Sequence, residues 1–145
     1  MIVDPRVAKR KFDRDVRPIV EDPDAFGVLG MRLIAASYPI LRVALAWPGK
    51  GEIPLELRAN DWDFRPASAT WVAEDGGPWT GGVPNANGFQ AGDATHRPWL
   101  CFAGSLEYHE WPGHHTDHWW ARRNDPNVRL LGFVQHIASV LRKTP

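Results

Sequence analysis

Two strand patterns joined by a short turn occupy residues 40–58, which read ILRVALAWPGKGEIPLELR. The first pattern ends at Pro48-Gly49-Lys50-Gly51, a combination typical of turns. The second pattern, from Ile53 to Arg58, alternates apolar and polar residues as a strand with one buried face does. Because a parallel pair needs a long crossover connection, a turn this short predicts an antiparallel hairpin.

Two further strand patterns flank this hairpin. Residues 31–38 precede it, and residues 68–72 follow it after a short connection at residues 59–67. The connections are too short to carry crossover helices, so we expect a four-stranded antiparallel meander. Residues 73–98 are rich in glycine and proline and show no sustained periodicity, which predicts a long irregular segment beside the functional site.

An amphipathic helix is predicted at each end of the chain. Asp4-Pro5 is typical of a helix start, and apolar residues then recur at helical spacing until Pro18 and Pro23 close the segment. Asp125-Pro126 repeats the start signal for a second helix that runs to the C-terminus. The apolar positions of the two helices are Ala8, Phe12, Val16 and Ile19, and Leu130, Val134, Ile137 and Leu141. This order predicts a two-layer α+β fold in a single domain, residues 1–145.

Charge and cysteine content exclude several classes of function. Lys and Arg number 17, as do Asp and Glu, so the chain lacks the basic excess of a nucleic-acid-binding surface. No apolar run approaches the roughly 20 residues of a membrane span, so we expect neither a nucleic-acid nor a membrane partner. Cys101 is the only cysteine, which excludes an internal disulfide and favours the cytoplasm.

Cys101 also opens the densest run of reactive side chains in the chain. Trp111-Pro112 follows it, together with four histidines: His109, His114, His115 and His118. A lone thiol in such company is either a nucleophile with supporting groups or part of a metal site. A free cysteine can also be an inert, buried side chain.

Three local matches carry a resemblance to the ubiquitin-conjugating (UBC) family. Trp62, Phe64 and Pro66 stand where that family has a Tyr-Pro-Phe-x-Pro-Pro turn after its third strand. Trp99-Leu-Cys101-Phe is similar to the Ile-Cys-Leu segment around the family's catalytic cysteine. Trp111-Pro112, 10 and 11 residues further on, is close to the family's Trp-x-Pro. The resemblance covers residues 5–142 and points to the divergent bacterial branch.

The resemblance implies a UBC-like domain whose Cys101 carries a ubiquitin-like protein as a thioester. Its partners would be that ubiquitin-like protein, an activating enzyme and an acceptor protein that supplies an amine. The family's His-Pro-Asn motif supports the oxyanion, and here Pro84-Asn85 stands 16 residues before the cysteine without the histidine. Asn85 is therefore the candidate oxyanion donor, by analogy.

The histidine-rich segment supplies candidate proton-transfer groups. His109 lies eight residues after Cys101, beyond a Gly-Ser that can turn the chain back, and we expect it to be the base or thiolate partner. Glu110 or Asp117 would orient a histidine. His114, His115 and His118 are further supporting candidates. No cofactor is required for this chemistry.

Two alternatives stay open on the sequence. His114 and His118 lie four residues apart, and with Cys101 or His109 they would supply three zinc ligands for a zinc-binding protein or hydrolase. The other alternative is a noncatalytic UBC-like binding module, in which a tryptophan-lined groove recognises a partner and Cys101 is incidental. The chain has eight tryptophans, which would suit such a groove.

Overall fold

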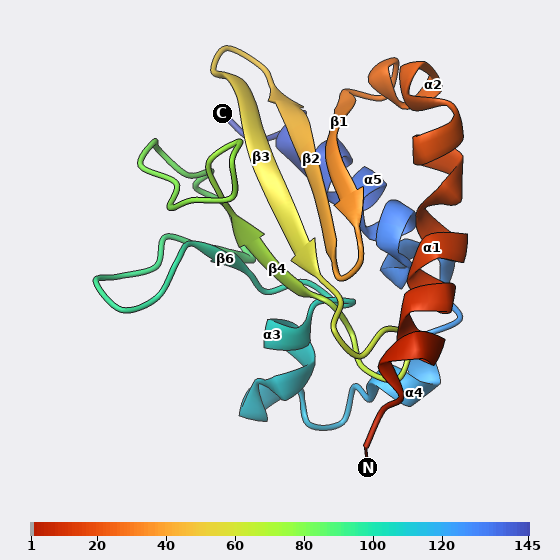
Figure 1. The fold of residues 1–145 in the computed structure, drawn as a ribbon. Helices are drawn as coiled ribbons and strands as arrows, with labels where there is room; N and C mark the ends of the chain where they lie inside the picture. The colour runs from red at the N-terminus through yellow and green to blue at the C-terminus, as the bar shows by residue number, and fades with distance from the viewer. Residues whose placement is uncertain (1) are drawn as a thin grey trace.

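The hairpin at residues 40–58 forms the centre of an antiparallel sheet in the computed structural model, which describes residues 2–145 (Figure 1). The predicted α+β class and four-stranded meander are confirmed. The meander consists of β1 (Met31–Ser37), β2 (Ile40–Trp47), β3 (Gly51–Arg58) and β4 (Ser68–Trp71). Two strands of two residues each, β5 (Phe89–Gln90) and β6 (Trp99–Leu100), extend it in the order β1-β2-β3-β4-β6-β5.

The strand register separates an apolar face of the sheet from a polar one. Leu41 pairs with Leu57 and Val43 with Leu55, and these four side chains are fully buried. On the opposite face, pairing aligns a row across four strands: Arg42, Glu56, Thr70 and Trp99. Because side chains alternate along a strand, every second residue contributes to the core. On this second face Glu56 is buried, whereas Thr70 and Trp99 are partly exposed, so the β4–β6 end of the face is the more accessible one.

Two long helices pack on the apolar face, as Figure 1 shows for α1 and for α5 behind the strands. They are α1 (Pro5–Glu21) and α5 (Leu130–Leu141), and all eight apolar positions predicted from helical spacing are buried. The shorter helices are α2 (Pro23–Gly27), α3 (Leu106–Glu110) and α4 (Trp119–Arg122), with 3₁₀ turns η1 (Pro112–His114) and η2 (Pro126–Val128). Within residues 2–145, no helix is long and apolar enough to cross a membrane.

The predicted closure of α1 at Pro18 and the predicted start of α5 need correction. Pro18 does not close α1 but lies in its last turn, on the exposed side of the helix. The helix ends at Glu21, and Pro23 begins α2. Asp125-Pro126 starts the 3₁₀ turn η2 rather than the long helix. Arg129 follows in an extended conformation, so α5 begins at Leu130.

A cluster of charged side chains joins the two long helices to the loop between β3 and β4. Arg129 donates to the carboxylates of Asp15 in α1 and Asp63 in the loop. Trp62 also donates to Asp15, over 2.8 Å, and the Arg129 guanidinium lies 4.7 Å from the centre of the Trp62 ring. The side chains of Asp63 and Asp15 are only 10% and 15% exposed, so these pairs are shielded from water.

The pKa values of both carboxyls reflect this pairing. Burial alone would raise the pKa of Asp63, but the hydrogen bonds and positive charges of Arg129 and Lys11 outweigh burial and lower it. For Asp15, hydrogen bonds from Arg14 and Trp62 and the charge of Arg129 lower the pKa in the same way. A lowered pKa means that the stabilisation is present at neutral pH and is lost as the pH falls through the folded-state value.

Replacing Arg129 by methionine tests the contribution of this cluster. The substitution leaves two largely buried carboxylates with weaker compensation, so we expect the free energy of unfolding to fall by about 3–5 kcal/mol. Urea unfolding measures the change. The matched control is Lys9→Met, which removes an exposed ion pair with Asp13 and should cost less than about 1 kcal/mol. Equal stability of R129M and wild type would contradict a structural role for the cluster.

Candidate functional site

Cys101 lies directly after β6, at the edge of the sheet's polar face. Leu100 points into the core and Trp99 lies on the polar face. The Cys101 N–H donates to the Gly88 carbonyl over 2.7 Å, which continues the β5–β6 ladder by one residue. Strand alternation therefore directs the Cys101 side chain to the same face as Trp99. The residue is partly exposed.

A short hydrogen-bonded loop, residues 101–105, connects Cys101 to α3. Ser105 is fully buried, and its hydroxyl donates to the Leu100 carbonyl over 2.9 Å. The same oxygen accepts from the Tyr108 N–H and so caps α3. Gly104 has a φ of +107°, and a Cβ there would lie 2.9 Å from the Phe133 ring, so only glycine fits. The hydrogen bonds of Ser105 and the close packing at Gly104 thus fix the loop.

A groove of about 480 Å³ lies on the polar face of β4 and β6, and Trp99, two residues before Cys101, lines it. We call it the β4–β6 groove. Its floor and walls combine two tryptophans with hydroxyl and charged side chains: Ser68, Thr70, Thr95, His96, Arg97, Trp99, Glu107 and Trp111. Cys101 is not among the residues that line this groove. It is linked to the groove by Trp99, two residues before it, and by Glu107, whose charge acts on the thiol.

Glu107 is the acidic group of this groove, and sequence reasoning missed it. Its carboxylate accepts hydrogen bonds from the Ser68 hydroxyl (2.8 Å) and the Ala69 N–H (2.6 Å), where a neighbouring strand would otherwise pair. Burial raises the pKa of Glu107 despite these hydrogen bonds. Burial, and then the Glu107 charge, raise the pKa of the Cys101 thiol. The thiol is therefore not activated as a thiolate in the free protein.

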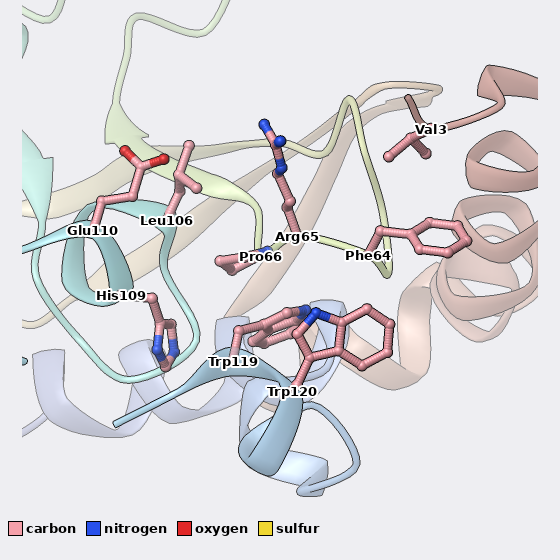
Figure 2. A pocket seen from close by; sticks show the side chains of 9 residues that line it. All are labelled: Val3, Phe64, Arg65, Pro66, Leu106, His109, Glu110, Trp119 and Trp120. Atoms are coloured by element: carbon pink, nitrogen blue, oxygen red, sulfur yellow. The ribbon is translucent and has the colours of Figure 1, made fainter. Parts of the chain in front are cut away.

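Helix α3 separates the β4–β6 groove from a second groove, shown in Figure 2. Glu107 and Trp111 face the first groove, while Leu106, His109 and Glu110 line the second. The other side of the second groove consists of the β3–β4 loop and α4: Phe64, Arg65, Pro66, Trp119 and Trp120, with Val3 at its end. We call this hollow of about 280 Å³ the aromatic groove.

His109, the expected base, is engaged on both ring nitrogens. Nε2 accepts from the Gly104 N–H over 3.0 Å, and Nδ1 lies 2.9 Å from the Asp117 carbonyl oxygen. An acceptor at Nε2 and a carbonyl at Nδ1 require the neutral tautomer with the proton on Nδ1. Burial lowers the pKa of His109, which favours the neutral form. The geometry indicates a support for the cysteine loop rather than a free base.

Asp117 contacts His109 through its backbone carbonyl rather than through its carboxylate. Its carboxylate instead accepts from the Tyr108 hydroxyl (2.7 Å) and from Arg122 (2.9 Å). Burial would raise the pKa of Asp117, and these two partners lower it. Glu110, the other proposed orienting group, is exposed at the rim of the aromatic groove.

The remaining histidines are turned to backbone groups or to solvent. His114 stacks on the Tyr108 ring and lies 3.1 Å from the Tyr108 carbonyl, while His115 lies 3.0 Å from the Pro112 carbonyl. His118 is exposed where α4 begins. Across residues 2–145, no three His, Cys, Asp or Glu side chains gather in an arrangement that could hold a metal ion. His114 and His118 are thus not joined to Cys101 or His109 as a set of ligands.

Asn85 lines a separate pocket near the β2–β3 turn, among residues that include Trp47, Lys50 and Trp79. It does not line either groove beside α3. Asn87 lies closer to Cys101, because it directly precedes Gly88, whose carbonyl accepts a hydrogen bond from the Cys101 N–H. Its spacing from Cys101 offers no sequence signal, since only the β5–β6 pairing brings it there.

Comparison with known proteins adds one relative. No family model matches the chain. The sequence is 28% identical to the uncharacterized protein y4jH of Sinorhizobium fredii (strain NBRC 101917 / NGR234), over 83% of this chain and 75% of that protein. The similarity therefore spans most of both chains.

Replacing Glu107 by glutamine tests the electrostatic link to Cys101. The amide oxygen still accepts from Ala69 and Ser68, but the negative charge is gone, so the thiol pKa should fall toward its ordinary value. Burial remains, and a full return is not expected. Because Cys101 is the only cysteine, the pH dependence of iodoacetamide alkylation reports its pKa directly. Glu110→Gln, on the outer side of the same helix, should leave the pKa unchanged; an equal shift in both variants would refute the link.

Proposed function

We propose that this protein is a ubiquitin-conjugating-like enzyme that carries a ubiquitin-like protein as a thioester on Cys101 and passes it to an amine of an acceptor protein. An activating enzyme supplies the acyl group, and the pathway belongs to the bacterial cytoplasm. The observation that carries the proposal is the position of the one cysteine. It directly follows β6, whose Trp99 lines the β4–β6 groove, within an α+β layout consistent with the UBC resemblance.

The first step is a thioester exchange. The Cys101 sulfur attacks the thioester carbonyl held by the activating enzyme, a new C–S bond forms, and the activating enzyme's thiol leaves. A proton must leave the Cys101 thiol for this step, and the departing thiolate takes up a proton, so the exchange is neutral overall. The loop of residues 101–105 holds the attacking sulfur in place through Ser105 and His109.

The electrostatics of the site favour the acylated state. Glu107 repels a thiolate and raises the thiol pKa, but it has no such conflict with an uncharged thioester. The carboxylate also attracts a lysine ammonium, whose aliphatic stem suits the Trp99 and Trp111 side chains of the same groove. The β4–β6 groove is therefore the proposed route of the acceptor.

In the second step, the amine nitrogen attacks the thioester and the C–S bond breaks. Glu107 accepts one proton from the ammonium, and the departing sulfur takes up a proton to regenerate the thiol. The net reaction converts a thioester and an ammonium into an amide, a thiol and one released proton. Because burial raises the pKa of Glu107, its carboxylate is a better proton acceptor than an exposed one.

A noncatalytic binding module is the second candidate function. The observation that favours it is the combination of an unactivated thiol with an exposed aromatic groove. Trp120 is 53% exposed at this groove, with the Arg123 guanidinium 4.0 Å from its ring centre. Exposed aromatic and arginine side chains are typical of protein interfaces. In this alternative the partner docks there and no acyl group is transferred.

Substitution of Cys101 separates the two candidates. After incubation with a candidate ubiquitin-like protein, its activating enzyme and ATP, the wild type should gain a thiol-labile adduct in non-reducing mass analysis. Cys101→Ala should gain none, and Cys101→Ser should gain an alkali-labile ester. An adduct that persists in C101A would refute Cys101 as the nucleophile. The absence of any adduct with verified partners would favour the binding module.

In the leading proposal the same exposed aromatic groove is the docking surface assigned to the activating enzyme, and replacing Trp120 by alanine tests this assignment. With C101A as the background, binding is measured without chemistry, and loss of this aromatic anchor should weaken affinity about tenfold or more. Trp111→Ala is the matched control, because Trp111 is equally exposed (54%) but lies outside this groove. Equal losses in both variants, or none in W120A, would contradict this assignment.

A further inference from the structure

The imidazole of His109 joins two segments that are otherwise separate. One is the loop of residues 101–105, contacted through the Gly104 N–H, and the other is the turn before α4, contacted through the Asp117 carbonyl. The ring packs edge-on against Tyr108 and Trp119, with centroids 4.9 and 5.7 Å away. These aromatic contacts fix the plane of the imidazole, so both hydrogen bonds depend on the same ring orientation.

The hydrogen bond to Gly104 has a strict protonation requirement. A backbone N–H can only donate, so Nε2 must carry a lone pair. Protonation would put an N–H on Nε2 facing the Gly104 N–H, and two donors cannot pair. The Asp117 bond survives protonation, since Nδ1 donates in both forms. Acidification therefore removes the contact with the cysteine loop selectively.

Burial and the charged groups around His109 determine the pH at which its ring is protonated. Burial, Arg122 and His114 favour the neutral ring, whereas Asp117 favours the charged one. Glu110 and Arg65 also line the aromatic groove beside it, at its exposed rim. Burial outweighs Asp117, and the pKa of His109 is lowered from 6.5. The contact is then present at neutral pH and is lost as the pH falls through this lowered value.

We propose that His109 is a positioning residue that holds the Cys101 loop closed only while its imidazole is neutral. The inference rests on the proposed function in taking Cys101 as the reacting group, but it requires neither the ubiquitin-like protein nor the activating enzyme. It assigns the histidine a role other than proton transfer: the ring fixes Gly104, and Gly104 and Ser105 together fix the turn that presents the thiol. Acid releases one of these two anchors.

Two substitutions separate hydrogen bonding from ring packing and from titration. His109→Gln supplies an amide oxygen for Gly104 and an amide N–H for Asp117, but it cannot titrate, so the loop should stay closed at every pH. His109→Phe keeps a ring of similar size and loses both hydrogen bonds, so the loop should open more readily than in the wild type, and to the same extent at every pH. The readout is the iodoacetamide alkylation rate of Cys101 in the protein alone, from about pH 5 to about pH 8 and normalised to the thiolate fraction.

Loss of one hydrogen bond shifts an opening equilibrium by about fivefold. H109F should therefore alkylate about fivefold faster than wild type at neutral pH, with a thiol pKa nearer its ordinary value. The wild type should approach the H109F rate on acidification, and H109Q should show no such inflection. Nitrogen NMR of the wild type should show the proton of His109 on Nδ1 at neutral pH.

The proposal is overturned if H109F and wild type react alike, if H109Q retains the acid inflection, or if the proton of His109 resides on Nε2. If H109F fails to fold, the H109Q profile and the NMR tautomer still decide. None of these readouts involves thioester loading. A protein that never loads a ubiquitin-like protein can thus still confirm the role of His109, and one that loads can still refute it.

Discussion

The paired charges around Arg129 are the constraint on which the arrangement of the molecule depends. Arg129 is the last residue before α5, and it joins α1 and the β3–β4 loop through Asp15 and Asp63. Trp119 adds a hydrogen bond from its indole to the Asp63 carbonyl, which ties α4 to the same loop. The loop that carries Phe64 is therefore fixed against three helices. This tie holds the β3–β4 loop against α4, the two elements that form one side of the aromatic groove.

Much of the fold follows from local patterns in the sequence. The hairpin signal at Pro48–Gly51 and the helical spacing of Phe12, Val16 and Ile19 predicted the sheet and α1 correctly, because burial decides both. The start predicted for α5 was several residues too early. The ion pairs of Arg129 favour an extended backbone where the cap signal predicted a helix. Strand β5 was missed because two residues are too few to show alternation.

The sequence singles out the candidate cysteine but not the groups that surround it. Cys101 stands out by being the only cysteine. It is partly exposed and lies two residues after Trp99, which lines the β4–β6 groove, and its role stays a prediction. Glu107 has no sequence signal, because its relation to Cys101 arises from the packing of α3 against β4. The histidines appeared interchangeable in the sequence. Backbone hydrogen bonds distinguish them, and these bonds depend on the fold rather than on spacing.

In the proposed cycle, the raised pKa of the thiol matters in the free protein, and the position of the thiol matters once partners are bound. A partly buried cysteine whose pKa is raised by burial and by a carboxylate is a poor spontaneous nucleophile, which protects it from oxidation and from unrelated electrophiles. A partner that brings an activated acyl group to the groove removes that limitation by proximity. In the proposed mechanism, the same carboxylate would face a neutral thioester and an incoming cation after acylation.

The central claim is that the acyl group resides on the sulfur of Cys101. Peptide mass spectrometry of the adduct, digested under acidic, thiol-free conditions, locates that bond directly. The account predicts the mass increment on the peptide that contains Cys101 and its complete release by a thiol reagent. An increment on a lysine peptide that resists thiol treatment would contradict the account, because the protein would then be an acceptor of the modifier rather than its carrier.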